Sequence, residues 1–207
     1  MKVKTKTKIV LTAIELFNLH GFSNVSLLKI AETLNLSPGN LTYHYQKKAD
    51  LMVAVYLHFQ KELLKVLPDE ADYTSIKDLD KQITNFYSFQ KRFKFFYLDL
   101  LEVGRAFPSI GNKHVEHIDG QIDRLYRILN KIASDMRLKT YQSEQTYKQL
   151  AHQMWMTSVF WMSQSMVRSQ EHKLDGLRNS LWFQIYPHLT ESGKEELAKF
   201  IDIEKFK

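Results

Sequence analysis

Hydrogen-bonding side chains gather in one short segment near the N-terminus of this 207-residue chain. Asn40 and Thr42 carry an amide and a hydroxyl that can bond to base edges, and a threonine methyl can touch thymine. Tyr43, His44 and Lys48 supply donors that suit phosphate oxygens, and Lys48 lies near a helix start, which also favours phosphate. These residue types predict contact with double-stranded DNA through a helix lying in the major groove.

Two short helices joined by a tight turn must position these side chains. The first begins after Ser26, a good N-cap, and its apolar residues recur at spacings of three and four: Leu27, Leu28, Ile30, Ala31 and Leu34. Asn35-Leu36-Ser37 supplies the turn.

The second helix begins at Pro38, which suits a first helical position, and Ser37 can cap it. Leu41 and Tyr45 are four apart and are expected to share the face that packs on the first helix. The remaining residues are small or polar, as in a reading helix. Each has an alternative: Tyr43 could pack inward, and His44 and Asn40 could be ordinary surface residues.

The positive charge is concentrated in the N-terminal third. Residues 1–66 hold nine lysines and four acidic residues, whereas the rest of the chain is almost balanced within a total of +6. Lys2, Lys4, Lys6 and Lys8 could reach phosphates, although a solubilising terminus would look the same.

Composition excludes several classes of protein. The chain has no cysteine, hence no disulfide and no thiolate site, and 44% apolar residues are enough for a real core. The basic N-terminus leads into no long apolar run, and no stretch of about 18 apolar residues occurs anywhere. We therefore expect a soluble, cytoplasmic protein with no membrane partner.

Helical patterns separated by glycine and proline extend through the whole chain and predict an all-α fold. No alternating strand pattern or phosphate-binding glycine loop is found. Outside the helix-turn-helix, the expected helices span residues 5–19, which His20-Gly21 ends, 47–67, which Pro68-Asp69 ends, 76–89, 93–107, 111–137, 142–172, 174–185 and 190–203.

The first sixty residues resemble the DNA-binding domain of the TetR family of transcriptional repressors. The similar segments, in order, are IVLTAIELF (9–17), HGF (20–22), SLLKIA (26–31), LSPGNLTYHY (36–45) and KADL (48–51). The resemblance implies a three-helix DNA-binding domain at residues 1–50, with a connecting helix to residue 67. It also implies an all-helical domain at 68–207 that dimerises and binds an inducer.

With this motif in place, we predict a set of DNA-contacting residues: Lys29, Ser37, Pro38, Gly39, Asn40, Thr42, Tyr43, His44 and Lys48. The chain departs from the family pattern at Thr42, where tyrosine is usual, at Tyr45, which replaces phenylalanine, and at Thr12, which replaces alanine. Base contacts of relatives therefore do not transfer directly, and sequence preference should differ at the Thr42-Tyr43-His44 segment.

Two aromatic segments in the C-terminal part suggest a ligand cavity. Residues 86–97 contain seven aromatics and residues 154–162 contain two tryptophans, a phenylalanine and three methionines. They could line a pocket for an apolar or aromatic small-molecule inducer, or simply form a solid core. The candidate wall residues are Phe86, Phe89, Phe93, Phe96, Trp155, Met156 and Phe160; the candidate polar anchors are Arg105, Gln121, His152 and Gln153.

A homodimer is expected because one short helix reads few bases, and two at fixed separation can read a near-palindrome. The helices at 142–172 and 174–185 are the expected interface, as a four-helix bundle across a two-fold axis. Its candidate residues are Phe160, Gln164, Val167, Trp182, Phe183 and Tyr186, although the aromatic ones could equally pack within one subunit.

No residues predict catalysis, a metal or a cofactor. His114 and His117 lie three apart, but the sequence places no third ligand beside them. The sequence thus favours a ligand-responsive repressor in which an inducer shifts the fourth helix. The alternatives are a helical enzyme or metal protein with an incidental helix-turn-helix, and a constitutive DNA-binding protein without an inducer.

Overall fold

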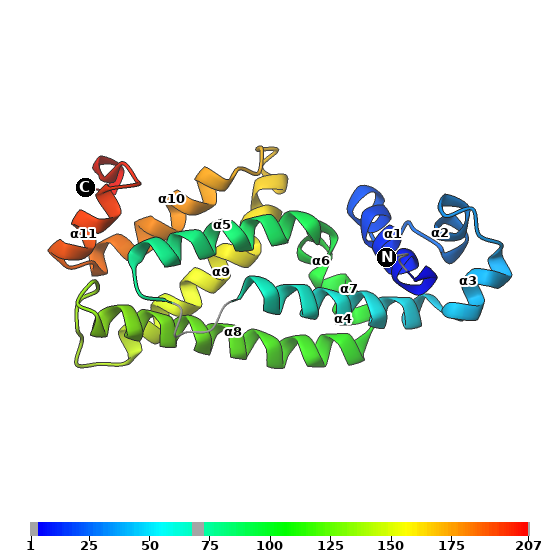
Figure 1. The fold of residues 1–207 in the computed structure, drawn as a ribbon, viewed down its shortest axis with the longest axis horizontal. Helices are drawn as coiled ribbons and strands as arrows, with labels where there is room; N and C mark the ends of the chain where they lie inside the picture. Colours follow the sequence, from blue (N-terminus) through cyan, green and yellow to red (C-terminus); the bar gives the residue numbers. More distant parts are fainter. Residues whose placement is uncertain (1–3, 68–72, 207) are drawn as a thin grey trace. The chain divides into compact units, whose positions relative to one another are not determined.

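The structure is a computed structural model that describes residues 4–67 and 73–206. Within these ranges the chain is α-helical, with one isolated bridge between Leu138 and Leu189 and no strand, so the predicted all-α class is confirmed (Figure 1). The helices are α1 Thr5–His20, α2 Leu27–Thr33, α3 Pro38–His44, α4 Lys48–Val66, α5 Ile76–Arg92, α6 Lys94–Leu98, α7 Leu100–Ala106, α8 Pro108–Ser134, α9 Gln145–Val167, α10 Leu174–Ile185 and α11 Glu191–Ala198, with short 3₁₀ turns at Tyr186–His188 and Ile203–Phe206.

Most predicted helices are present, and the differences lie at helix ends and at Asp99. The single helix expected at 93–107 is broken at Asp99 into α6 and α7, where the Asp99 carboxylate accepts a hydrogen bond from the Phe22 backbone N–H. α8 begins at Pro108 rather than Gly111, because proline fits a first helical position. The helix expected at 142–172 is shorter at both ends. The stop expected at Pro68-Asp69, like Lys2, lies outside the described residues.

Packing divides the chain into two compact units, of which the described parts are residues 4–65 with 89–114, and 66–67 and 73–88 with 115–206. We call them the first and second units. The functional division predicted from sequence, at residues 50 and 68, does not coincide with this packing because residues 89–114 fold with the first unit. That functional division stays a prediction.

The first unit is built on two connected sets of apolar side chains. α1 packs against α2 and α6, with Ile9, Ala13 and Phe17 fully or nearly fully buried. A dense aromatic cluster centres on Phe59 of α4, whose ring centroid lies 4.4 Å from that of Phe96 and 5.2 Å from that of Phe89. Rings packed at these distances form solid core.

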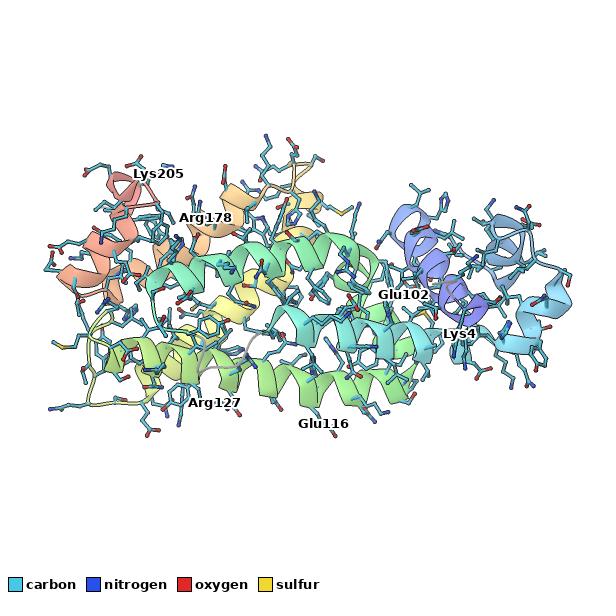
Figure 2. The ribbon with its side chains drawn as sticks, viewed as in Figure 1. Lys4, Glu102, Glu116, Arg127, Arg178 and Lys205 are labelled. Atoms are coloured by element: carbon cyan, nitrogen blue, oxygen red, sulfur yellow. The ribbon has the colours of Figure 1, made fainter. Side chains whose placement is uncertain are left out.

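The second unit is a helical bundle in which α9 and α10 pack closely together (Figure 1). Gly176 of α10 allows this approach, because a Cβ there would lie 2.6 Å from the Trp161 ring. The buried carboxylate of Asp80 on α5 receives two bonds from Arg178, from Nε at 2.6 Å and Nη2 at 2.5 Å, and a third from Trp182 Nε1 at 2.9 Å. Arg178 is labelled on α10 in Figure 2. This network ties α5 to α10.

Candidate functional site

Two capped helices joined by a tight turn build the helix-turn-helix, as the sequence predicts. Ser26 Oγ accepts from the Lys29 backbone N–H at 3.1 Å, and Ser37 Oγ accepts from the Asn40 backbone N–H at 3.2 Å. Between them, Asn35 has φ +53°, and the N–H of Leu36 bonds back to the carbonyl of Ala31 at 2.9 Å. This is the hydrogen bond of a Schellman motif with asparagine at the left-handed position.

The predicted inner faces of the two short helices are largely confirmed. Ile30 and Ala31 of α2 are buried, and so are Leu41 and Tyr45, which follow the expected spacing of four. Leu28 is the exception: it lies at the surface because a seven-residue helix buries only a narrow stripe.

α3 presents an uninterrupted polar face to solvent. Ser37, Pro38, Gly39, Asn40 and Thr42 are all exposed, and Tyr43 keeps 85% of its surface accessible. The alternative that Tyr43 packs inward is therefore wrong. His44 is half-buried, and its ring meets that of Tyr43 edge-on at 5.3 Å.

Thr42 combines a satisfied hydroxyl with an exposed position. Its Oγ1 donates to the carbonyls of Pro38 and Gly39 at 3.0 and 3.1 Å. A Cβ at Gly39 would meet no atom of another element within 4 Å among the described residues, so this position of α3 is open. The face offers the hydrogen-bonding and methyl groups that base edges recognise.

Lys48 occupies a different environment from the one expected for a phosphate contact. Its Nζ donates to the backbone carbonyl of Phe22 at 2.6 Å and lies 4.5 Å from the centre of the Phe22 ring. Partial burial lowers the pKa of its ammonium, and the nearby Glu102 carboxylate acts in the opposite direction. Lys48 therefore fastens the end of α1 to the start of α4, whereas Lys29 and Lys47 remain exposed.

Residues 92–102 hold the C-terminal end of α1 within the first unit. The Asn18 side chain donates to the Arg92 carbonyl at 2.8 Å and accepts from the Phe95 backbone N–H at 2.9 Å. Ser23 donates to the Glu102 carboxylate, which Figure 2 labels. These contacts were not predicted from the sequence because they join residues more than 70 positions apart.

A narrow apolar cavity lies inside the second unit, with about 630 Å³ of space between atoms when its open mouth is included. Three predicted ligand-binding residues line it: Phe86, Gln121 and Trp155. Trp155 Nε1 donates to Gln121 Oε1 at 3.3 Å. The other lining residues are Leu67, Tyr73, Leu79, Gln82, Ile83, Arg124, Leu125, Ile128, Met154, Ser158, Leu177 and Leu181.

The remaining predicted ligand residues do not line this cavity. Phe89, Phe93 and Phe96 belong to the packed aromatic core of the first unit, and Arg105 lies on its surface. In the second unit the residues on the outer side of α9 are exposed: His152, Gln153, Met156 and Phe160. Aromatic content pointed to helices that contribute to the cavity, but it did not show which face of each helix lines it.

Two polar residues in the cavity wall were not predicted from the sequence, Gln82 of α5 and Arg124 of α8. A signal was present, because each lies on the apolar face of its helix. Gln82 falls among Leu79, Ile83 and Phe86 at helical spacing, and Arg124 falls likewise among the residues Gln121, Leu125 and Ile128.

Five of the six predicted dimer residues are accessible to a partner subunit to some degree, and two stand out: Val167 is 86% exposed and Phe183 is 63% exposed. Phe160 is also exposed, and Gln164 and Tyr186 are half-buried. Trp182 was wrongly placed in this set. It has 0% exposure and its indole donates to Asp80, so it belongs to the core of its own subunit.

The two histidines that lie three apart, His114 and His117, are not part of a metal-binding group among the described residues. His114 lies against the rings of Tyr56 and Phe96, and burial lowers the pKa of His117. Among residues 4–67 and 73–206, no group of three or more potential ligands is placed to hold a metal ion. Over the same ranges no helix has the length and apolar character needed to cross a membrane.

Comparison with known proteins gives matches over both parts of the chain. Residues 9–55 match the family described as bacterial regulatory proteins of the tetR family, and residues 58–197 match the TetR model described as bacterial transcriptional repressor. A curated relative from Bacillus subtilis, the probable HTH-type transcriptional regulator YttP, is 32% identical over 83 residues. That match spans 40% of this chain and 40% of the relative.

Solved structures agree in fold. A TetR-family transcriptional regulator from Marinobacter aquaeolei VT8 superposes with a TM-score of 0.86 at 24% identity, covering 99% of this chain and 100% of that one. SmeT, the repressor of the Stenotrophomonas maltophilia efflux pump SmeDEF, was solved with triclosan; it gives a TM-score of 0.63 at 20% identity, covering 91% and 93%. The chain belongs to the TetR family of bacterial transcriptional regulators.

Proposed function

We propose that this regulator is a ligand-responsive repressor that holds a near-palindromic DNA operator as a homodimer. The proposal rests on the exposed polar face of α3. Its residues Asn40, Thr42 and Tyr43 are exposed to solvent, and Ser37 caps the start of the helix. Two copies of α3 would occupy successive major grooves. The basic N-terminal residues, of which Lys4, Lys6 and Lys8 are exposed, would add phosphate contacts.

The inducer would bind in the cavity of the second unit. Its mostly apolar wall favours an apolar or aromatic body, as does the binding of triclosan by SmeT, a repressor of similar fold. A ligand changes DNA affinity only if it binds one conformation more tightly than the other. A ligand can therefore release DNA only if some helix moves when the cavity is filled.

α5 is suited to this role in addition to the fourth helix. Its residues Leu79, Gln82, Ile83 and Phe86 line the cavity, and its last residue, Arg92, accepts the hydrogen bond from Asn18 of α1. A shift of α5 along its axis would therefore displace the Arg92 carbonyl and change its hydrogen bond to the C-terminal end of α1. The coupling would pass through one continuous helix.

Dimerisation would use the outer sides of α9 and α10, where Met156, Phe160, Val167 and Phe183 expose apolar surface. Such a patch is typical of a surface that a second subunit covers. Sedimentation equilibrium of the full chain should give a dimer mass, and a monomer at all concentrations would contradict this part of the proposal.

One experiment tests the function as a whole. Fragments bound by the purified protein are selected from random DNA and sequenced, and ligands are then screened for release of the enriched fragment by fluorescence anisotropy. We expect an enriched near-palindrome and release by a cavity-binding compound. The absence of any enriched sequence would refute operator binding, and tight binding that no cavity ligand weakens would indicate a constitutive regulator.

A further inference from the structure

Unpaired polar atoms face the apolar cavity of the second unit. The Nε and Nη2 atoms of Arg124 are buried and make no hydrogen bond or ion pair with any described residue. Gln82, only 8% exposed, likewise leaves its Oε1 without a partner. Both side chains are in the wall of the same cavity, on α8 and α5 respectively.

Leaving these atoms unpaired is costly. A buried polar group without a hydrogen bond loses its hydration without compensation, and the loss is greater for an ion. Arginine cannot escape by losing its proton, because its guanidinium stays charged at any pH a protein experiences. The cavity wall therefore contains a cationic side chain with two buried, unpaired N–H donors, which an anion would satisfy.

The geometry of the free atoms specifies the kind of anion. Nε and Nη2 form one edge of the guanidinium fork, and that edge matches the two oxygens of a carboxylate. The same protein shows this pairing elsewhere: Arg178 uses its own Nε and Nη2 to hold both oxygens of Asp80. Asp80 is committed to Arg178 and Trp182, so it does not neutralise Arg124.

We propose that the cavity binds an apolar monoanion whose carboxylate pairs with the free edge of Arg124. Its hydrocarbon or aromatic body lies against Phe86, Trp155 and the aliphatic wall, and Gln82 hydrogen-bonds to a polar group near the head. This inference rests on the cavity being the inducer site, and it narrows the inducer from any apolar compound to an amphipathic acid.

Three probes with the same chain length test the charge requirement: octanoate, octanol and octylamine. Binding to the full-length protein is measured by titration calorimetry. Because hydrogen bonds to charged groups contribute more than neutral ones, octanoate should bind at least about tenfold more tightly than octanol, and octylamine should bind more weakly than either. Equal affinities, or no octanoate binding at millimolar concentration, would overturn the proposal.

Two variants with a matched control locate the charge. Arg124→Gln should lower octanoate affinity to that of octanol while leaving octanol binding unchanged, and Arg124→Lys should keep part of the preference because it keeps the charge but loses the fork. Arg127→Gln removes a charge from an exposed position on the same helix, labelled in Figure 2, and should change neither affinity. Circular dichroism melts verify folding of each variant.

The chain itself is the other possible source of a carboxylate. Asp69, Glu70 and Asp72 lie outside the described residues, between the cavity-lining residues Leu67 and Tyr73. If one of them neutralised Arg124, Arg124→Gln would destabilise the ligand-free protein and leave octanoate affinity unchanged. That result would overturn the proposal.

Failure of this inference differs from failure of the proposed function. If a neutral cavity ligand released operator DNA from the wild type and from Arg124→Gln equally well, that result would refute the anion proposal and would still support a ligand-responsive repressor. Arg124-dependent binding of octanoate that leaves operator affinity unchanged would support the anion site and argue against an inducer role for it.

Discussion

Polar side chains are in opposite environments on the α3 surface and in the cavity wall. On α3 the polar side chains are exposed, and the hydroxyl of Thr42 is satisfied within its own helix. In the cavity, Arg124 and Gln82 carry buried atoms that lack partners. Water hydrates the exposed polar groups of α3 until DNA replaces it. Buried polar atoms without partners keep their desolvation cost until a ligand pairs with them.

The difference would allow one chain to recognise two unrelated partners, DNA and the proposed ligand. A short helix with exposed donors can read DNA with little rearrangement, since the protein already has the required geometry. The unpaired donors of Arg124 would make the second unit sensitive to an anionic ligand, because pairing them would remove an energetic penalty. The following predictions test each side of this contrast.

The largest effect is expected in the second unit. Trp182→Ala should lower the free energy of unfolding by about 3–5 kcal/mol, because it removes a fully buried ring and a donor to Asp80. Urea titration at several protein concentrations measures the loss. The neighbouring Phe183→Ala serves as the control and should weaken dimerisation with little effect on the subunit core. The reverse pattern would restore Trp182 to the interface.

The reading face comes next. Asn40→Ala with Thr42→Ala should reduce discrimination by ~1–3 kcal/mol at the base pairs that these residues read, with non-specific binding unchanged. Selection from random DNA, repeated with the double variant, reports the change in preference. An unaltered preference with intact binding would remove both residues from base readout.

Substitution of Lys48 tests whether this half-buried cation stabilises the first unit. Lys48→Ala should destabilise the helices α1 to α4 by about 1–2 kcal/mol, since the Phe22 carbonyl loses the hydrogen bond that the Lys48 ammonium donates. Hydrogen exchange of their amides measures the loss.

The salt dependence of DNA binding separates this role from a phosphate contact. Lys47→Ala, at an exposed position, should lower the salt slope by about 1 if Lys47 contacts a phosphate, while Lys48→Ala leaves the slope unchanged. A lower slope for Lys48→Ala without destabilisation would assign Lys48 to the DNA instead.

The smallest effect concerns the ion pair between α4 and the end of α5. Hydrogen bonds from Lys65 and Arg92 lower the pKa of Glu62 to about 2 from an ordinary 4.5. A lowered carboxyl pKa stabilises the fold above the unfolded-state pKa, and the gain disappears as pH falls towards 2. Because both cations are mostly exposed, Glu62→Gln should cost no more than about 1 kcal/mol at pH 7.

The pH dependence provides the check. Unfolding free energies of the wild type and Glu62→Gln should converge between about pH 5 and pH 2. A constant difference over that range would mean that the substitution acts through packing rather than charge.

The helix-turn-helix could be predicted because its determinants are local. The Ser26 and Ser37 caps, Pro38, and the spacing of Leu41 and Tyr45 lie within twenty residues, and each acts on its own helix. The role of Lys48 could not be predicted, since its acceptor is a backbone carbonyl 26 positions away that carries no signature in the sequence.

The cavity was only partly predictable because several helices contribute to it. Aromatic content identified Phe86 and Trp155 but also pointed to Phe89 and Phe93, which pack in the first unit. A more specific signal was a polar residue at the centre of an apolar stripe, as at Gln82 and Arg124. Amphipathic spacing shows that such a residue faces inward, but only tertiary structure shows whether it meets a partner or a cavity.

The position of Trp155 has a spectroscopic consequence. Of the three tryptophans in the chain, Trp155 lines the cavity, whereas Trp161 and Trp182 are absent from its wall. Its indole N–H is bonded to Gln121, so a ligand that enters the cavity alters both the polarity around the ring and its hydrogen bond. The regulator thus contains an intrinsic fluorophore at the proposed ligand site, and its emission would follow occupancy of the cavity without a label.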